Sequence, residues 1–154
     1  MDEQVRILVI CTGNSARSQM AEGLLRHLGG ERMQVFSAGA EPSGQVHPLA
    51  VQAMAELGLD ISAHRPKSLI TFLGQPFDFV IAVCSHAAQS CPVFPGPAKR
   101  LNWFYDDPAA VQGSEAERLA AFRTLRDDLR KRTADWLADL AREAQPPRPI
   151  APLN

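Results

Sequence analysis

The feature that most constrains this chain is the loop at residues 11–18, which reads CTGNSARS. An apolar run at residues 5–10 precedes it and is typical of a buried strand. In the stretch after it, Met20, Leu24 and Leu28 recur every four residues, as on one face of a helix. A strand, a short loop and a helix in this order predict an α/β protein with a parallel sheet.

The loop carries residue types that hold anions. Backbone N–H groups at the start of a helix point at one spot and favour negative charge there. Arg17 offers a fork of donors that matches a tetrahedral oxyanion, and this setting favours Cys11 as a nucleophilic thiolate. The predicted oxyanion-binding residues are Thr12, Gly13, Asn14, Ser15, Ala16, Arg17 and Ser18. In the alternative interpretation, Cys11 is only a buried residue at the end of a strand.

Length and charge exclude several classes of protein. The chain has 154 residues, 16 basic and 17 acidic side chains and a formal net charge of −1. This balance gives no reason to expect nucleic-acid binding, and no apolar run is long enough to predict a membrane span or a signal segment. Three cysteines, an odd number, do not suit a secreted disulfide framework. We therefore expect a monomer in the cytoplasm.

Strands and helices alternate along the chain. Strands are expected at residues 5–10, 33–37, 77–83 and 100–103, and helices at residues 19–28, 49–57 and from 114 onward. Ser114 and Glu117 form a capping box that starts the last helix. The pattern predicts an α/β fold with a four-stranded parallel sheet flanked by helices on both faces. We expect residues 1–144 to form one domain and the Pro-rich residues 145–154 to be a loose tail.

Three further side chains follow predicted strands, at the edge where ligands of open α/β sheets bind. Asp107 lies before Pro108, where it can protonate a departing oxygen, although Asp-Pro pairs also occur in simple turns. Cys84 and Cys91 are either reactive thiols or inert core residues. Six residues separate them, a spacing too long for a typical zinc pair, so we expect no metal.

Taken together, these stretches resemble the low-molecular-weight protein tyrosine phosphatases and the arsenate reductases that share their fold. The likeness runs from Val5 to about Ala144. Residues 83–85 and 90–92, which contain Cys84 and Cys91, match the redox pair of the thioredoxin-coupled reductases. Where the phosphatases usually carry aromatic side chains, this chain has only small ones, namely Ala16, Ala109 and Ala110.

The resemblance implies a first step on arsenate or phosphate. Cys11 attacks the oxyanion, Asp107 protonates the leaving oxygen, and Arg17 with the loop amides stabilises the charge. Ser18 matches the serine of the family that donates a hydrogen bond to the nucleophile.

For arsenate, the resemblance implies a relay of three cysteines. Cys84 attacks the Cys11 adduct, which releases arsenite and leaves a Cys11–Cys84 disulfide. Cys91 then attacks Cys84, and thioredoxin reduces the resulting Cys84–Cys91 disulfide without any organic cofactor. A phosphomonoesterase and a non-catalytic oxyanion or thiol sensor are the alternative functions.

Two details of the resemblance concern the support of the loop. Ser37 matches a serine whose hydroxyl supports the anion loop in the family. Without the resemblance, the sequence around Ser37 favours a hydrogen bond from its side chain to the nearby backbone of a turn. Asn14, Glu22 and Ser37 match potassium ligands of some reductases, and Lys67 stands near the place of the fourth. Lys67 can therefore put an ammonium group where the cation would lie.

The segment between the second and third cysteines is predicted to be helical. A helix over residues 85–91 would separate the Cα atoms of Cys84 and Cys91 by about 10 Å. A disulfide tolerates about 7 Å, so the helix would have to unwind for the two thiols to join.

Overall fold

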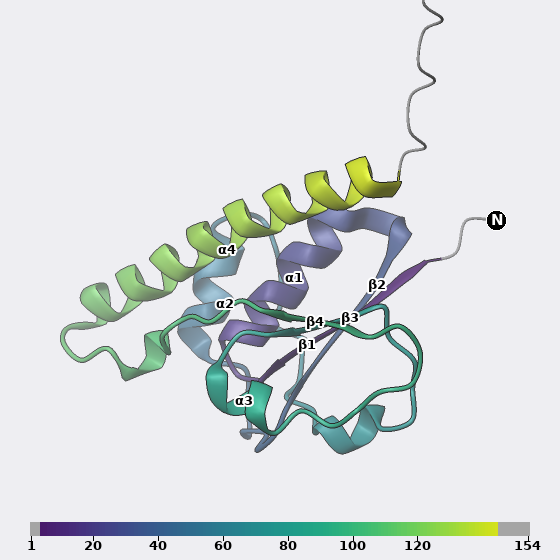
Figure 1. Ribbon diagram of the computed structural model, residues 1–154. Helices are drawn as coiled ribbons and strands as arrows, with labels where there is room; N and C mark the ends of the chain where they lie inside the picture. The colour runs from purple at the N-terminus through teal and green to yellow at the C-terminus, as the bar shows by residue number, and fades with distance from the viewer. Residues whose placement is uncertain (1–3, 145–154) are drawn as a thin grey trace, which may run out of the picture.

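The centre of the protein is a four-stranded parallel sheet in the computed structural model, which describes residues 4–144 (Figure 1). The strands are β1 (Val5–Cys11), β2 (Met33–Gly39), β3 (Phe79–Ala82) and β4 (Lys99–Asn102). Their order is β2-β1-β3-β4, which places β1 and its loop in the interior of the sheet. The predicted four-stranded parallel sheet is therefore confirmed. The predicted tail at residues 145–154 lies outside the described residues.

Helices cover both faces of the sheet, as predicted. They are α1 (Arg17–Gly29), α2 (Pro48–Ala55), α3 (Ser85–Gln89) and α4 (Glu115–Ala144), with short 3-10 turns at Gly30–Arg32, Leu69–Phe72 and Pro108–Ala110. Figure 1 shows α1, α2 and α4 on one side of the sheet and α3 on the other. No helix among the described residues is long and apolar enough to cross a membrane.

Aromatic contacts show how each face of the sheet is packed. Phe79 on β3 meets Trp136 of α4 with ring centroids 5.0 Å apart. On the opposite face, Phe36 on β2 packs against Phe72 at 5.5 Å. Because side chains of a strand alternate between faces, β1 supplies buried residues to both layers.

The long helix α4 covers the face that carries α1 and α2. Its start agrees with the predicted capping box, since Ser114 Oγ accepts a hydrogen bond from the Glu117 N–H at 3.1 Å. Four apolar side chains on its inner face are buried, namely Leu119, Phe122, Leu125 and Leu129. Glu56, just after α2, accepts hydrogen bonds from Arg123 at 2.6 Å and from Arg126 at 2.7 Å, and these tie α4 to α2.

The helix predicted over residues 85–91 is shorter in the structure. Helix α3 ends at Gln89, two residues before Cys91. Pro92 explains this, because the residue before a proline is disfavoured in helical conformation. The separation of about 10 Å, which assumed a continuous helix up to Cys91, therefore does not apply.

Candidate active site

The loop between β1 and α1 is fixed by backbone bonds on its outer side. Four of its carbonyls accept hydrogen bonds of 2.8 to 3.2 Å from N–H groups in residues 40–47. Gly39, at the end of β2, lies so close that a Cβ there would be 2.5 Å from Thr12 O and 2.9 Å from Asn14 N. Asn14 itself has a positive φ of 51°. The loop carbonyls thus face outward, which suits a loop whose amides bind an anion.

The sulfur of Cys11 is buried and has two hydrogen-bond partners. The Asn14 N–H lies 3.1 Å from Cys11 Sγ, and Ser18 Oγ lies at 2.8 Å. Asn14 Nδ2 donates to Ser18 Oγ at 2.7 Å. This bond leaves the Ser18 hydroxyl proton free to turn toward the sulfur. The Asn14 N–H, together with the Ser18 hydroxyl when it donates, can stabilise negative charge that develops on the sulfur, as the predicted nucleophile requires.

A chain of hydrogen bonds continues from the loop into the core. Asn14 Nδ2 also donates to Ser37 Oγ at 2.9 Å, and Ser37 donates to Glu22 Oε1 at 2.9 Å. The local backbone bond favoured for Ser37 by the residues alone is therefore wrong, because its hydroxyl bridges β2 to α1 and to the loop. Glu22 is buried and thereby fixes the far end of this network.

Lys67 lies where the resemblance placed it. Its Nζ is 4.0 Å from Glu22 Oε1 and donates to Arg65 O at 3.0 Å. Burial lowers the pKa of Lys67, while Glu22 acts in the opposite direction. Asn14 Oδ1 is also taken, since it accepts from the Lys67 N–H at 2.9 Å. These groups do not fit a potassium site, because an ammonium group already faces the carboxylate and N–H donors occupy the amide oxygen.

Two buried or stacked polar residues belong to the site although the sequence did not reveal them. Gln19, on α1, donates to the backbone carbonyl of Asn14 at 3.2 Å and so braces the loop. The His47 N–H donates to Ser15 O at 2.9 Å, and its ring packs on Phe122 with centroids 4.7 Å apart. Burial lowers the pKa of His47, and Asp107 opposes that shift. A single polar residue in an amphipathic helix or turn carries no periodic signal that could have found either one.

Arg17 is the first residue of α1, and the predicted acid, Asp107, lies in the loop after β4. Arg17 Nη1 donates to Tyr105 O at 2.9 Å, which ties the start of α1 to the loop that carries Asp106 and Asp107. Both aspartates are exposed, and Asp107 Oδ1 caps the following turn by accepting from Ala109 N at 2.9 Å. Asp107 therefore makes the local bond that is expected of a simple Asp-Pro turn. Its second carboxyl oxygen is available for the proposed proton transfer.

The second and third cysteines differ in their surroundings. Cys84 is buried at the start of α3, where its sulfur lies 3.4 Å from Thr12 Oγ1 and 3.4 Å from the Ala87 N–H. Cys91 is half-buried and donates to Pro92 O at 3.3 Å. All three thiols are free. The structure therefore brings Cys84 against the Cys11 loop and holds Cys91 outside it.

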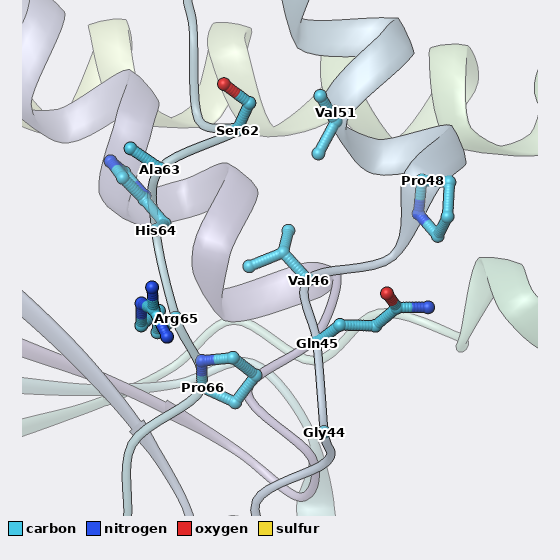
Figure 2. Close-up of a pocket in the computed structure, with 10 residues that line it drawn as sticks. All are labelled: Gly44, Gln45, Val46, Pro48, Val51, Ser62, Ala63, His64, Arg65 and Pro66. Carbon is cyan, nitrogen blue, oxygen red and sulfur yellow. The ribbon is translucent and has the colours of Figure 1, made fainter.

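A cavity of about 470 Å³ lies beside the loop rather than over Cys11 (Figure 2). Val46, Val51 and Pro66 point into the gap between its two walls. Ser15 Oγ donates to Gln45 O at 3.0 Å, so one wall is joined to the loop. Among residues 4–144, no three His, Cys, Asp or Glu side chains are placed to hold a metal ion.

Comparison with known proteins identifies the family. Residues 6–146 match the low molecular weight phosphotyrosine protein phosphatase family. The chain belongs to this family. It is 45% identical over 126 residues to an arsenate reductase of Halalkalibacterium halodurans, a match that covers 82% of this chain and 90% of that protein.

Solved structures agree with the expected phosphatase-like fold. An arsenate reductase in its oxidized state superposes with a TM-score of 0.73 at 31% identity, covering 91% of this chain and 99% of that one. A thioredoxin-dependent arsenate reductase of Corynebacterium glutamicum gives a TM-score of 0.71 at 26% identity, covering 92% of this chain and 64% of that one. The resemblance inferred from the sequence is confirmed.

Proposed function

We propose that this protein is a thioredoxin-dependent arsenate reductase that works through Cys11, Cys84 and Cys91. The observation that carries the proposal is the placement of Cys84 against the Cys11 loop through Thr12. A phosphatase needs the nucleophile and an acid but no second thiol beside them. The names of the relatives support the same activity.

The first step uses the loop as an anion cradle. Arsenate binds to the loop amides and Arg17, and the Cys11 thiolate attacks arsenic. Asp107 protonates the departing oxygen, which leaves as water. The Asn14 N–H and the Ser18 hydroxyl lie within hydrogen-bond distance of the sulfur and hold it in position for this attack.

The second step reduces the arsenic. The Cys84 thiolate attacks Cys11 Sγ, a sulfur–sulfur bond forms, and the electron pair of the sulfur–arsenic bond stays on arsenic. Arsenate has then become arsenite, and two thiols have become one disulfide. Thiolate exchange with Cys91 frees Cys11, and the dithiol of thioredoxin restores Cys84 and Cys91. We further propose a monomer in the cytoplasm, where the three free thiols stay reduced between turnovers.

The test is arsenate-dependent oxidation of a supplied thioredoxin system, followed by NADPH consumption through thioredoxin reductase. We expect turnover with the wild type and none with Cys11→Ser or Cys91→Ser. Cys91→Ser should still release about one arsenite per chain, because the first two steps need only Cys11 and Cys84. Rapid hydrolysis of an aryl phosphate without any arsenate reduction would instead identify a phosphomonoesterase.

A further inference from the structure

Arg100 joins strand β4 to the segment that carries Cys91. Its Nη2 donates to Pro92 O at 2.9 Å and reaches Cys91 O at 3.4 Å. Strand β4 is fixed in turn, since Val80 of β3 pairs with Arg100 in the parallel sheet. The residues just after α3 are therefore held against the sheet by one guanidinium group.

The Pro92 carbonyl also accepts a hydrogen bond from the Cys91 thiol. Cys91 Sγ donates its proton to Pro92 O at 3.3 Å, so Pro92 O receives both the thiol and the guanidinium. When Cys91 loses its proton, Pro92 O keeps the guanidinium as a donor, so this carbonyl stays hydrogen-bonded. The thiolate then lies beside a cation.

Burial and the charge of Arg100 have opposite effects on the pKa of the Cys91 thiol. Burial raises the pKa of Cys91, and the Arg100 cation opposes the rise. Arg100 is itself exposed, and its guanidinium reaches the Cys91 backbone from strand β4. Without this guanidinium, the thiol would be protonated over a wider range of pH and would be a poorer nucleophile.

A cavity of about 150 Å³ gives the Cys91 side chain room to move. It lies where α3 meets the sheet, and Cys91, Ala88, Ala82, Arg100 and Ile10 are among the residues that line it. Ile10 directly precedes Cys11, so the cavity extends from the third cysteine to the strand that carries the first. Arg100 and Cys91 thus border the same open space beside the sheet.

We propose that Arg100 is a positioning residue that holds Cys91 and favours its thiolate for the last exchange of the relay. This inference rests on the proposed function. In that exchange, Cys91 releases its proton to solvent and its thiolate attacks Cys84 Sγ. The Cys84–Cys91 bond forms, the Cys11–Cys84 bond breaks, and Cys11 leaves as a thiolate.

The test compares Arg100→Met and Arg100→Lys with a neighbouring control, Lys99→Met. The full-length reduced protein is treated with iodoacetamide across a pH series, and alkylation of Cys91 is measured by peptide mass spectrometry. We expect Arg100→Met to shift the alkylation profile to higher pH and to slow alkylation at pH 8 about threefold, because a smaller fraction of the thiol is ionised there. Arg100→Lys should shift it less, because the charge remains, and Lys99→Met should match the wild type.

A second readout separates the steps of the relay. Arsenite release without thioredoxin needs only Cys11 and Cys84, so Arg100→Met should leave this single turnover unchanged. Steady-state turnover with thioredoxin should fall about threefold in the same variant. Identical alkylation profiles for Arg100→Met and Lys99→Met would overturn the inference, as would loss of the single turnover. A shifted profile in a protein whose wild type reduces no arsenate would refute the proposed function and leave the action of Arg100 on Cys91 established.

Discussion

The Thr12 hydroxyl lies 3.4 Å from the Cys84 sulfur although 72 positions separate the two residues. Thr12 directly follows the nucleophile, so this contact brings the second thiol to the rim of the anion loop. The same sulfur caps α3 by accepting from the Ala87 N–H at 3.4 Å. Cys84 therefore links the chemistry of the loop to the integrity of a short helix.

Oxidation should open that helix. A Cys84–Cys91 disulfide engages the Cys84 sulfur and removes the cap that it provides to the Ala87 N–H. We expect the amides of α3 to lose protection from hydrogen exchange in the oxidised protein, while those of α1 keep theirs. Mass spectrometry on both redox states measures this, and equal protection of α3 in the two states would contradict the prediction.

Ser18→Ala removes one of the two hydrogen-bond partners of the Cys11 sulfur. We expect alkylation of Cys11 at pH 7 to slow about tenfold, because a hydrogen bond to a charged group contributes about 1.5 kcal/mol or more. Ser15→Ala is the matched control, since that hydroxyl donates to Gln45 O and not to the sulfur. Equal rates in the two variants would show that Ser18 does not support the thiolate.

Arg17→Lys keeps the charge but loses the planar fork. We expect kcat/KM for arsenate to fall about 100-fold, together with weaker phosphate binding in calorimetry. The variant also loses the geometry of the bond to Tyr105 O. Arg65→Lys, at an exposed position outside the loop, should change neither quantity. Unchanged phosphate affinity in Arg17→Lys would place Arg17 outside the anion site.

The two neighbouring aspartates can be told apart by the rate of single-turnover arsenite release in their variants. Asp107→Asn removes the proposed acid and should slow single-turnover arsenite release about 100-fold, an effect typical of a lost general acid. Asp106→Asn should have little effect, because Asp106 is exposed and does not cap the turn. The reverse ranking would mean that Asp106 supplies the proton.

The bridge between α2 and α4 predicts a change of stability in acid. Hydrogen bonds from Arg123, and next from Arg126, lower the pKa of Glu56 from 4.5 to about 2. A carboxyl with a depressed pKa stabilises the fold fully above its unfolded pKa, and this contribution is lost as the pH falls toward the folded value. Wild type should therefore melt above Glu56→Gln at pH 7, and the gap should close between pH 4.5 and about 2. Glu31→Gln, an exposed control, should show no such closing gap.

Local features of the sequence predicted the fold well and located the Cys11 loop between a strand and a helix. The apolar run, the loop and the amphipathic segment after it specify β1, the Cys11 loop and α1, because each signal depends on close neighbours in the chain. The same holds for the Ser114 cap of α4. The start of α3 at Ser85 was predicted correctly. Its end was predicted too late, because the prediction did not include the effect of Pro92 on the residue before it.

The long-range hydrogen bonds that hold the site together could not be predicted from local features. Ser37 bonds Asn14, 23 positions away, so its residue type and its neighbours in sequence indicated only a local turn. The partner of Arg17 is the carbonyl of Tyr105, a backbone atom that every residue type possesses. Contacts of this kind depend on the arrangement of whole strands, and no pattern along one segment encodes them.

The close approach of Gly39 to the loop has a consequence for protein engineering. Any side chain at this position would collide with Thr12 O and Asn14 N, so the shape of the anion cradle depends on a residue that lies outside it. Transplanting residues 11–18 into another parallel sheet would therefore fail unless the adjacent strand also ended in glycine. The portable unit of this chemistry is a pair of strand ends rather than a single loop.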